Sequence, residues 1–343
     1  MNVLDKVLTL RPTSVVSRLG HASRLPVLNP RELLKALEGV PAALPCVPVP
    51  VRPMLPGLLA AARGEDAVLG LMCPHPLADR GAAERFVAFV QQVAEADGHA
   101  RPLFLQAGPV RVPHADAEAL SQLQQGVYRL VEAGFPLVSL DVSRLPVDEA
   151  VEAVRRLAGP VVERELGLEV SLPGVDPGSE LEGASSLLAG LRGLGVRFLR
   201  VSALALGEED PDVEFLRSLV ELAGQAGVGV SVGEAGRRSV RALPTYVAAG
   251  VRKVDVSAPF ERLALGMYPE AVRSSLEQKA EKAGLGAGEL LGVVGEQLAP
   301  LGAPEATRLE ALTFTEASDV LASVGARRTG WKSMLFLANN RGD

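Results

Sequence analysis

The sequence has few of the residues that build extracellular, membrane-spanning or base-stacking proteins. It contains two cysteines, Cys46 and Cys73, which are too few for a disulfide framework and indicate reduced thiols in a cytoplasmic protein. Aromatic residues make up 4% of the chain, so platforms for stacking bases are scarce. No apolar run reaches the roughly eighteen residues of a membrane span. Asp5, Lys6 and Arg11 interrupt the apolar amino-terminus, which therefore does not read as a signal peptide.

The sequence also lacks an excess of positive charge. It has 41 acidic residues against 35 Lys and Arg, a formal net charge of −6. A nucleic-acid surface needs a basic stripe, so we expect no nucleic-acid partner. There is no Walker loop, no dinucleotide-binding glycine motif after the first strand, no C-x-x-C, no H-E-x-x-H and no G-x-S-x-G elbow. Cys73 and His75 stand one residue apart, but two ligands do not make a metal site, and a packed thiol beside a surface histidine is the simpler interpretation.

What the chain does have is a repeating pattern of short Val- and Leu-rich runs separated by amphipathic segments. The runs lie at residues 46–52, 67–73, 102–107, 137–143, 168–172, 197–203, 228–233 and 251–257. A helix between successive strands implies a parallel sheet. Eight such units predict an α/β protein of the (βα)₈ TIM-barrel type, and an open doubly wound sheet is the alternative.

The strand pattern predicts which side chains enter the barrel. Val138, Leu140 and Val142 share one face of their run, and the alternate face is polar, as barrel strands require. The polar faces carry five charged residues: Asp141, Glu169, Arg200, Lys253 and Asp255. Unpaired charges inside a barrel are very costly, so these side chains form a structural ion-pair network or a polar pocket at the mouth. In the second case, the candidate catalytic residues are Asp141, Glu169, Lys253 and Asp255.

The two ends of the chain are predicted to be accessory. Residues 1–43 are an amino-terminal helical extension, 44–265 the barrel, and 266–343 a carboxy-terminal helical extension that packs on it. Further helices are expected at 30–39, 268–283, 286–299 and 315–324. The segment 330–337 holds the only tryptophan, Trp331, and either packs on the barrel or forms an interaction patch.

Glycines follow three of the predicted strand ends. Gly207 follows the sixth run, Gly233 and Gly236 the seventh, and Ser257 ends the eighth. Backbone N–H groups in such loops can bind phosphate, and Arg237 and Arg238 add positive charge nearby. The alternative is that these are βα turns that require glycine.

Two longer segments resemble the class II fructose/tagatose-bisphosphate aldolase superfamily. They are AGFPLVSLDVSRLPVDEAVEAV (133–154) and VGEAGRRSVRALPTYVAAGVRKVDVSAPFERLAL (232–265). The stretches at 66–109 and 169–174 (EVSLPG) are most similar to the non-catalytic Z-type subunits of tagatose-bisphosphate aldolase. The resemblance spans roughly residues 45–265. It implies a TIM barrel, a sugar-phosphate ligand, and phosphate loops at Gly207, Gly233, Gly236 and Ser257.

The resemblance also implies zinc chemistry, and here the sequence departs from the family. The positions of the family's zinc ligands are held by Leu105, Gln106, Ser171, Leu206 and Val232, and its strand-eight asparagine is Asp255. Leucine and valine cannot bind zinc, and glutamine and serine bind it poorly. We therefore expect no metal and no cofactor, and a pseudoenzyme that acts as a sugar-phosphate-binding or partner subunit, with a protein partner or as a homo-oligomer.

Two alternatives stay open. One is an active aldolase or lyase that uses its carboxylates, or Lys253 as a Schiff base. The other is a structural or scaffolding protein.

Overall fold

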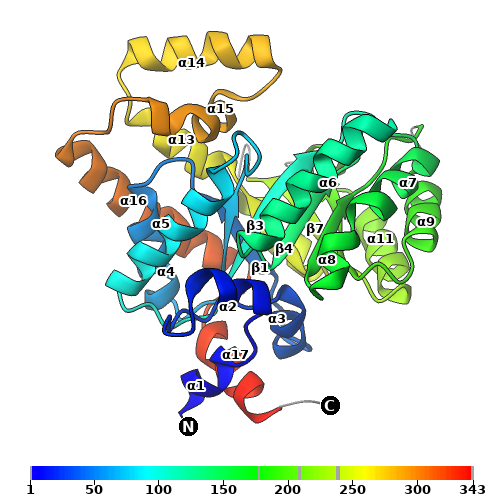
Figure 1. The fold of residues 1–343 in the computed structure, drawn as a ribbon, viewed down its shortest axis with the longest axis horizontal. Coiled ribbons are helices and arrows are strands. Elements are labelled where there is room, and N and C mark those ends of the chain that lie inside the picture. The colour runs from blue at the N-terminus through cyan, green and yellow to red at the C-terminus, as the bar shows by residue number, and fades with distance from the viewer. Residues whose placement is uncertain (1, 177, 208–209, 237–239, 341–343) are drawn as a thin grey trace.

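The computed structural model describes residues 2–176, 178–207, 210–236 and 240–340, and its centre is a closed barrel of parallel strands (Figure 1). The strands are β1 (Leu44–Pro48), β2 (Leu69–Cys73), β3 (Leu103–Arg111), β4 (Leu137–Asp141), β5 (Gly167–Ser171), β6 (Val196–Ser202), β7 (Gly229–Ala235) and β8 (Lys253–Val256). Each strand pairs in parallel with the next, and β1 pairs with β8 through Leu44 and Lys253. The predicted TIM barrel is thus confirmed, and the doubly wound sheet is excluded.

Six of the eight strands differ in length from the predicted runs, and the carboxyl ends of β1 and β3 differ most. β1 ends at Pro48 rather than near residue 52, because the chain turns there toward the first barrel helix, and Pro50 and Pro53 have no N–H group to continue a ladder. β3 extends to Arg111, four residues past the predicted end. The extension carries the β3 end up to the mouth of the barrel.

Helices surround the strands. The first half of the chain has α1 (Val3–Leu8), α2 (Thr13–Leu19), α3 (Pro30–Ala36), α4 (Met54–Gly64), α5 (Ala82–Ala96), α6 (Ala117–Glu132), α7 (Val147–Leu157) and α8 (Gly159–Glu163). The second half has α9 (Glu180–Gly190), α10 (Ala203–Leu206), α11 (Val213–Gln225), α12 (Leu243–Ala248), α13 (Ala258–Gly266), α14 (Glu270–Ala283), α15 (Ala287–Val294), α16 (Ala303–Ser323) and α17 (Thr329–Asn339). Two 3₁₀ turns cover Val240–Ala242 and Gly295–Gln297. No helix among the described residues is both long and apolar enough to cross a membrane.

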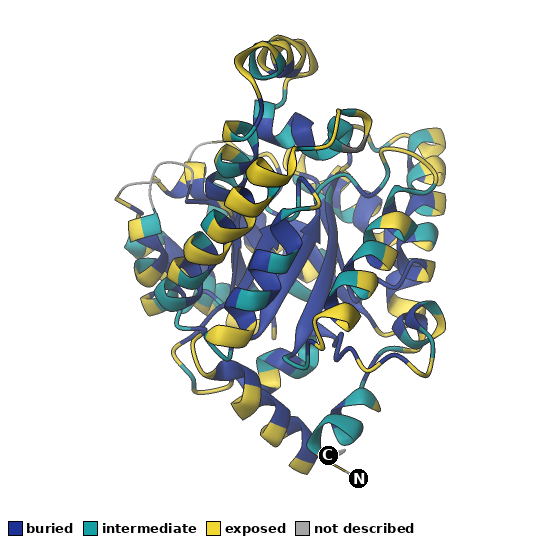
Figure 2. Cartoon of the chain, turned by 90° about the vertical axis from the view of Figure 1, so that its left-hand side faces the viewer, coloured by how far each residue is buried: buried dark blue, intermediate teal, exposed yellow. Residues whose placement is uncertain are grey.

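The main hydrophobic core lies between the strands and the helices. Val138, Leu140 and Val170 of the predicted helix-facing set are buried there together with Val90 of α5 and Leu130 of α6. Figure 2 shows the strands as a buried centre enclosed by helices whose outer faces are exposed. The strand faces predicted to meet the helices are confirmed.

The ring of helices includes one from the predicted carboxy-terminal extension. α16 packs along α4 and also contacts α12 and α13. The prediction that the barrel ends at residue 265 therefore leaves out the helix that lies beside α4. α16 is also longer than the predicted 315–324.

The two ends of the chain meet at the amino-terminal end of the barrel. α17 contacts both α1 and α3 at the base of the molecule in Figure 1. Met334 and Leu337 of α17 are buried, whereas Trp331, Leu335 and Phe336 are partly exposed. The segment 330–337 therefore packs on the barrel and also leaves apolar side chains at the surface.

Candidate functional site

The inside of the barrel is divided into an apolar lower layer and a polar upper layer. Leu44, Phe104, Leu137 and Phe198 fill the lower layer, in one hydrophobic cluster with residues of α1, α3 and α17. The polar layer begins at Lys253, whose ammonium lies 5.7 Å from the centre of the Phe198 ring. The apolar layer seals the base, so a ligand reaches the polar groups from the carboxyl ends of the strands.

Three of the four predicted catalytic candidates meet in the polar layer. The Lys253 ammonium donates to Glu169 Oε1 at 2.8 Å and also pairs closely with Asp255. The Ser231 hydroxyl donates to the same Glu169 oxygen at 2.6 Å. Lys253 and Glu169 are 0% exposed and Asp255 1%, so the network is shielded from solvent.

The charges of this network fix its protonation. Burial alone would lower the pKa of Lys253, but Asp255 and Glu169 outweigh it, and the pKa lies above its ordinary value. Burial would raise the pKa of Glu169, but the positive charges of Lys253 and Arg200 hold it below its ordinary value. Burial raises the pKa of Asp255, and repulsion from Glu169 adds to the effect. Lys253 is therefore a buried, protonated partner of two carboxylates, which weighs against its use as a Schiff-base nucleophile.

Asp141, the fourth candidate, lies apart from this network at the end of β4. Its Oδ1 accepts hydrogen bonds from the Ser171 hydroxyl and the Ser143 N–H, each at 3.1 Å. Burial would raise the pKa of Asp141, but these donors and the charge of Arg200 hold it below its ordinary value. Asp141 is therefore an ionised acceptor at the mouth.

Arg200 of β6 connects the two groups. It is 7% exposed, and its guanidinium lies over Gly233 of β7, because a Cβ at position 233 would overlap it. Arg200 Nε is 3.6 Å from Asp255 Oδ2, and Nη2 is 3.9 Å from Glu234 Oε1. Both distances are too long for hydrogen bonds, so Arg200 keeps donor capacity toward the mouth.

Glu234 is a site residue that the sequence did not reveal. Its φ of +59° is unusual for a residue with a side chain, and the β7–β8 register shifts between Val232 and Ala235. Glu234 Oε2 accepts a hydrogen bond of 2.7 Å from the Ser202 hydroxyl. The bulge thus brings a carboxylate beside Arg200. The only signal in the sequence is the placement of Glu234 between Gly233 and Gly236, which does not specify whether the Glu234 side chain points into the barrel.

A cavity of about 530 Å³ opens above these groups. Asp141, Arg200, Glu234 and Asp255 lie in its floor, and Met72, Leu77, Val110 and Leu285 are among its apolar walls. α15 covers one side, held by Glu289, whose Oε1 lies 2.7 Å from a nitrogen of Arg111 and 4.0 Å from His75 Nε2. Burial lowers the pKa of His75 below its ordinary value, so this histidine is neutral at pH 7.

The predicted phosphate residues are spread around this mouth. Ser257 lines the cavity, and Gly233 lies beneath Arg200. Gly207 and Gly236 have φ angles of +80° and +76°. Neither is among the described residues that line the cavity. Arg237 and Arg238 lie outside the described residues. Phosphate binding at these positions remains a prediction.

The positions that would hold zinc do not form a metal site. Leu105, Leu206 and Val232 belong to the helix-facing hydrophobic core. Gln106 and Ser171 face the barrel interior, where Gln106 Nε2 lies 3.4 Å from Asp255 Oδ2. Among the described residues, no three His, Cys, Asp or Glu side chains are placed to share a metal ion. The side chains present do not fit the zinc chemistry that the resemblance implies.

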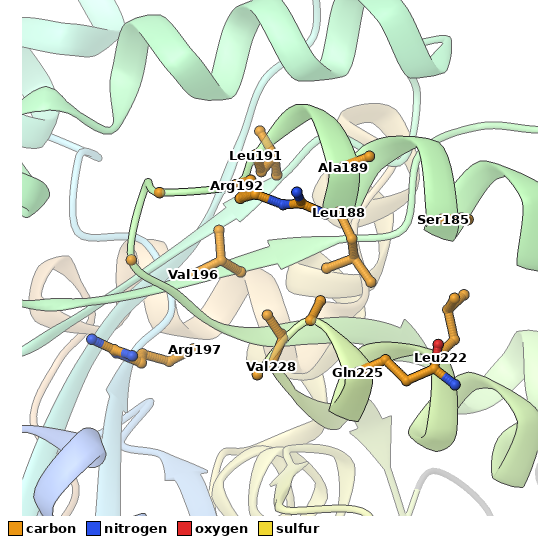
Figure 3. A pocket seen from close by; sticks show the side chains of 14 residues that line it. Ser185, Leu188, Ala189, Leu191, Arg192, Val196, Arg197, Leu222, Gln225 and Val228 are labelled. Atoms are coloured by element: carbon orange, nitrogen blue, oxygen red, sulfur yellow. The ribbon is translucent and has the colours of Figure 1, made fainter.

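A second cavity of about 640 Å³ lies between α9 and α11, at the amino-terminal ends of β6 and β7 (Figure 3). Arg192 and Arg197 border it, and its described lining contains no carboxylate. It lies at the opposite end of the strands from the charged mouth and shares no residue with it.

The architecture defines the chain as a closed (βα)₈ barrel, and solved structures with a similar fold include aldolases. The YdjI aldolase of Escherichia coli K12 superposes with a TM-score of 0.57 at 13% identity, over 87% of this chain and 96% of that one. A fructose-bisphosphate aldolase of Campylobacter jejuni superposes with a TM-score of 0.62 at 11% identity, over 88% and 95%. No family model and no curated protein sequence matches the chain. At these identities the likeness establishes the fold.

Proposed function

We propose that this chain is a divergent, zinc-free barrel of the class II aldolase type that binds a sugar phosphate at its mouth and acts as a non-catalytic or regulatory subunit. The observation that carries the proposal is the buried network of Lys253, Glu169 and Asp255. The network lies directly beneath the mouth, whose lining includes Asp255, and its charged groups pair with one another. The aldolase names of the structurally similar proteins support a phosphorylated sugar as the ligand.

The charge of the mouth favours a ligand with a single phosphate. Arg111 and Arg200 are the cations of the described cavity lining, against five carboxylates: Asp141, Glu234, Asp255, Glu261 and Glu289. Carboxylates accept hydrogen bonds from sugar hydroxyls but repel phosphate. A hydroxyl-rich monophosphate satisfies both requirements better than a bisphosphate.

The first test is titration calorimetry with fructose 6-phosphate, fructose 1,6-bisphosphate and fructose. We expect the monophosphate to bind best, and Asp141→Asn to weaken it by roughly tenfold because a charged acceptor is lost. Asp148→Asn, an exposed carboxylate on α7, is the matched control and should bind like the parent. Stoichiometric zinc together with cleavage of a ketose bisphosphate would overturn the proposal.

One observation favours an active enzyme as the second candidate. Asp141 and Asp255 line the same cavity, and their environments shift their pKa values in opposite directions, as an acid–base pair requires. In that case, incubation with a panel of ketose phosphates should give cleavage products detectable by NMR, and Asp141→Asn should abolish them. Persistence of products in that variant would exclude Asp141 as the acid or base.

A further inference from the structure

A third cavity, of about 550 Å³, lies beside the mouth, and the proposed function does not use it. Its described walls come from the loops after β1 and β2, from α5, and from the chain between α15 and Leu301. Pro74 and His75 line both this cavity and the mouth, so the two cavities share a wall. Its volume falls in the range of small-molecule sites, ~300–1,000 Å³.

The walls bring together aromatic side chains, of which the chain has few. Phe86 and Phe89 of α5 line the cavity together with Tyr268, which follows α13. The Phe86 ring stacks on Phe135, with ring centres 5.9 Å apart. The Arg52 guanidinium lies 5.1 Å from the centre of the Phe89 ring. These contacts hold the two phenylalanine rings in place, and both residues are only half-buried, so part of each ring is available to a flat ligand.

Prolines give the cavity a fixed shape. Pro50 and Pro53 follow β1, Pro74 follows β2, and Pro300 lies across the cavity lining from another part of the chain. Proline has a fixed φ angle and no N–H group, so these loops lose little freedom when a ligand binds. A site that is already formed retains more of its contact energy as affinity.

One polar group inside the cavity lacks a partner. Tyr268 is 8% exposed. Burial raises the pKa of its hydroxyl, and no hydrogen bond within the described structure offsets that effect. A buried tyrosine hydroxyl usually has a partner, because an unmade hydrogen bond costs free energy. The charged side chains of the described lining are exposed at the rim, where Arg85 pairs with Asp79 at 2.7 Å. The interior is therefore apolar apart from groups such as this hydroxyl.

We propose that this cavity is a separate binding site for a flat aromatic small molecule of one or two rings that carries a hydroxyl or carbonyl group. The rings pack against Phe86, Phe89 and Leu301, and the polar group pairs with the Tyr268 hydroxyl. Burial of the rings supplies affinity, and the hydrogen bond supplies orientation.

The experiment is equilibrium dialysis of the full chain against 2-naphthol, which has two fused rings and one hydroxyl. We expect one molecule to bind per chain. Ala82→Leu enlarges a side chain of the α5 wall, so it should weaken binding at least roughly tenfold. Ala88→Leu is the matched control, because Ala88 is exposed on the same helix and lies outside the lining, and it should bind like the parent.

Tyr268→Phe tests the polar contact, and it keeps the test decisive if Ala82→Leu does not fold. It should weaken binding by about three- to tenfold, because one hydrogen bond is lost. Tyr128→Phe, at an exposed position of α6, should bind like the parent. Two results overturn the inference. One is a parent protein that does not bind 2-naphthol, and the other is binding that either folded cavity variant leaves unchanged. Neither result depends on whether a sugar phosphate binds at the mouth.

Discussion

Buried ionisable side chains in this barrel differ in whether they have a partner. Lys253 is fully buried and held between two carboxylates. His99, which follows α5 on the outside of the barrel, is 3% exposed, and within the described structure neither of its ring nitrogens has a hydrogen-bond partner. Burial lowers the pKa of His99 to about 4. A paired charge supports the fold over a wide pH range, whereas an unpaired neutral histidine makes stability depend on pH.

The first prediction concerns that dependence. The unfolded chain protonates His99 near its ordinary pKa of 6.5, but the folded chain does so only near 4, so the unfolded state binds more protons between these values. The free energy of unfolding should therefore fall as pH drops from about 6.5 to 4, by roughly 3 kcal/mol from this residue. Urea unfolding at several pH values measures it. His99→Leu should flatten this part of the profile, and His21→Leu, at an exposed position, should not. A profile unchanged in His99→Leu would contradict the assignment.

Single residues also mark what the sequence could and could not predict about the site. Alternation along the strands placed Asp141, Glu169, Arg200, Lys253 and Asp255 inside, since a strand turns every second side chain inward. Which of them pair is set by register between distant strands: Glu169 and Lys253 are 84 positions apart. Glu234 was missed because the direction of its side chain depends on its own left-handed backbone conformation in a bulge. Residues that carry a Cβ rarely adopt this conformation, so the identity of the residue does not predict it.

At the scale of elements, the contact between α4 and α16 joins the start of the barrel to its end. Gly57 of α4 faces α16, and a Cβ there would overlap the carbonyl oxygen of Glu310 and lie 3.1 Å from the amide nitrogen of Phe314. Backbone atoms cannot move aside as a side chain can. The missing Cβ of Gly57 is therefore what permits this approach.

The second prediction follows from that contact. Gly57→Ala should destabilise the protein by about 1–3 kcal/mol, because the two helices must separate. Gly64→Ala, at the exposed end of the same helix, would place its Cβ 3.8 Å from the Phe314 ring, an ordinary contact. It should leave stability unchanged or raise it by up to about 1 kcal/mol through lower entropy of the unfolded chain. Equal thermal denaturation midpoints for the two variants would disprove the close-packing explanation.

The same contact explains why the predicted domain boundary left α16 out. Local patterns predicted a helix over 315–324, which overlaps the carboxy-terminal half of the observed Ala303–Ser323. Its place beside α4, about 250 residues earlier in the sequence, depends on side chains that meet only in three dimensions. Periodicity predicts that a helix exists, but not which neighbour it packs against.

At the scale of the whole molecule, the barrel has a base that contributes stability and a mouth that carries charge. Leu33 of α3 and Met334 and Leu337 of α17 join the apolar layer beneath Lys253. Both chain ends therefore close the barrel from below, while α15 covers the mouth at the opposite end of the strands. Changes at the base should alter the free energy of unfolding without altering the groups at the mouth.

The third prediction tests this division within one helix. Leu337 is 3% exposed and Leu335 is 38% exposed, although both belong to α17. Leu337→Ala should cost about 2–4 kcal/mol in urea unfolding, and Leu335→Ala less than about 1 kcal/mol. Under conditions where both variants are folded, each should bind fructose 6-phosphate like the parent, because neither residue lines the mouth. A similar cost for the two would mean that α17 does not seal the base. Weakened ligand binding by folded Leu337→Ala would mean instead that base and mouth are coupled through the apolar layer on which Lys253 rests.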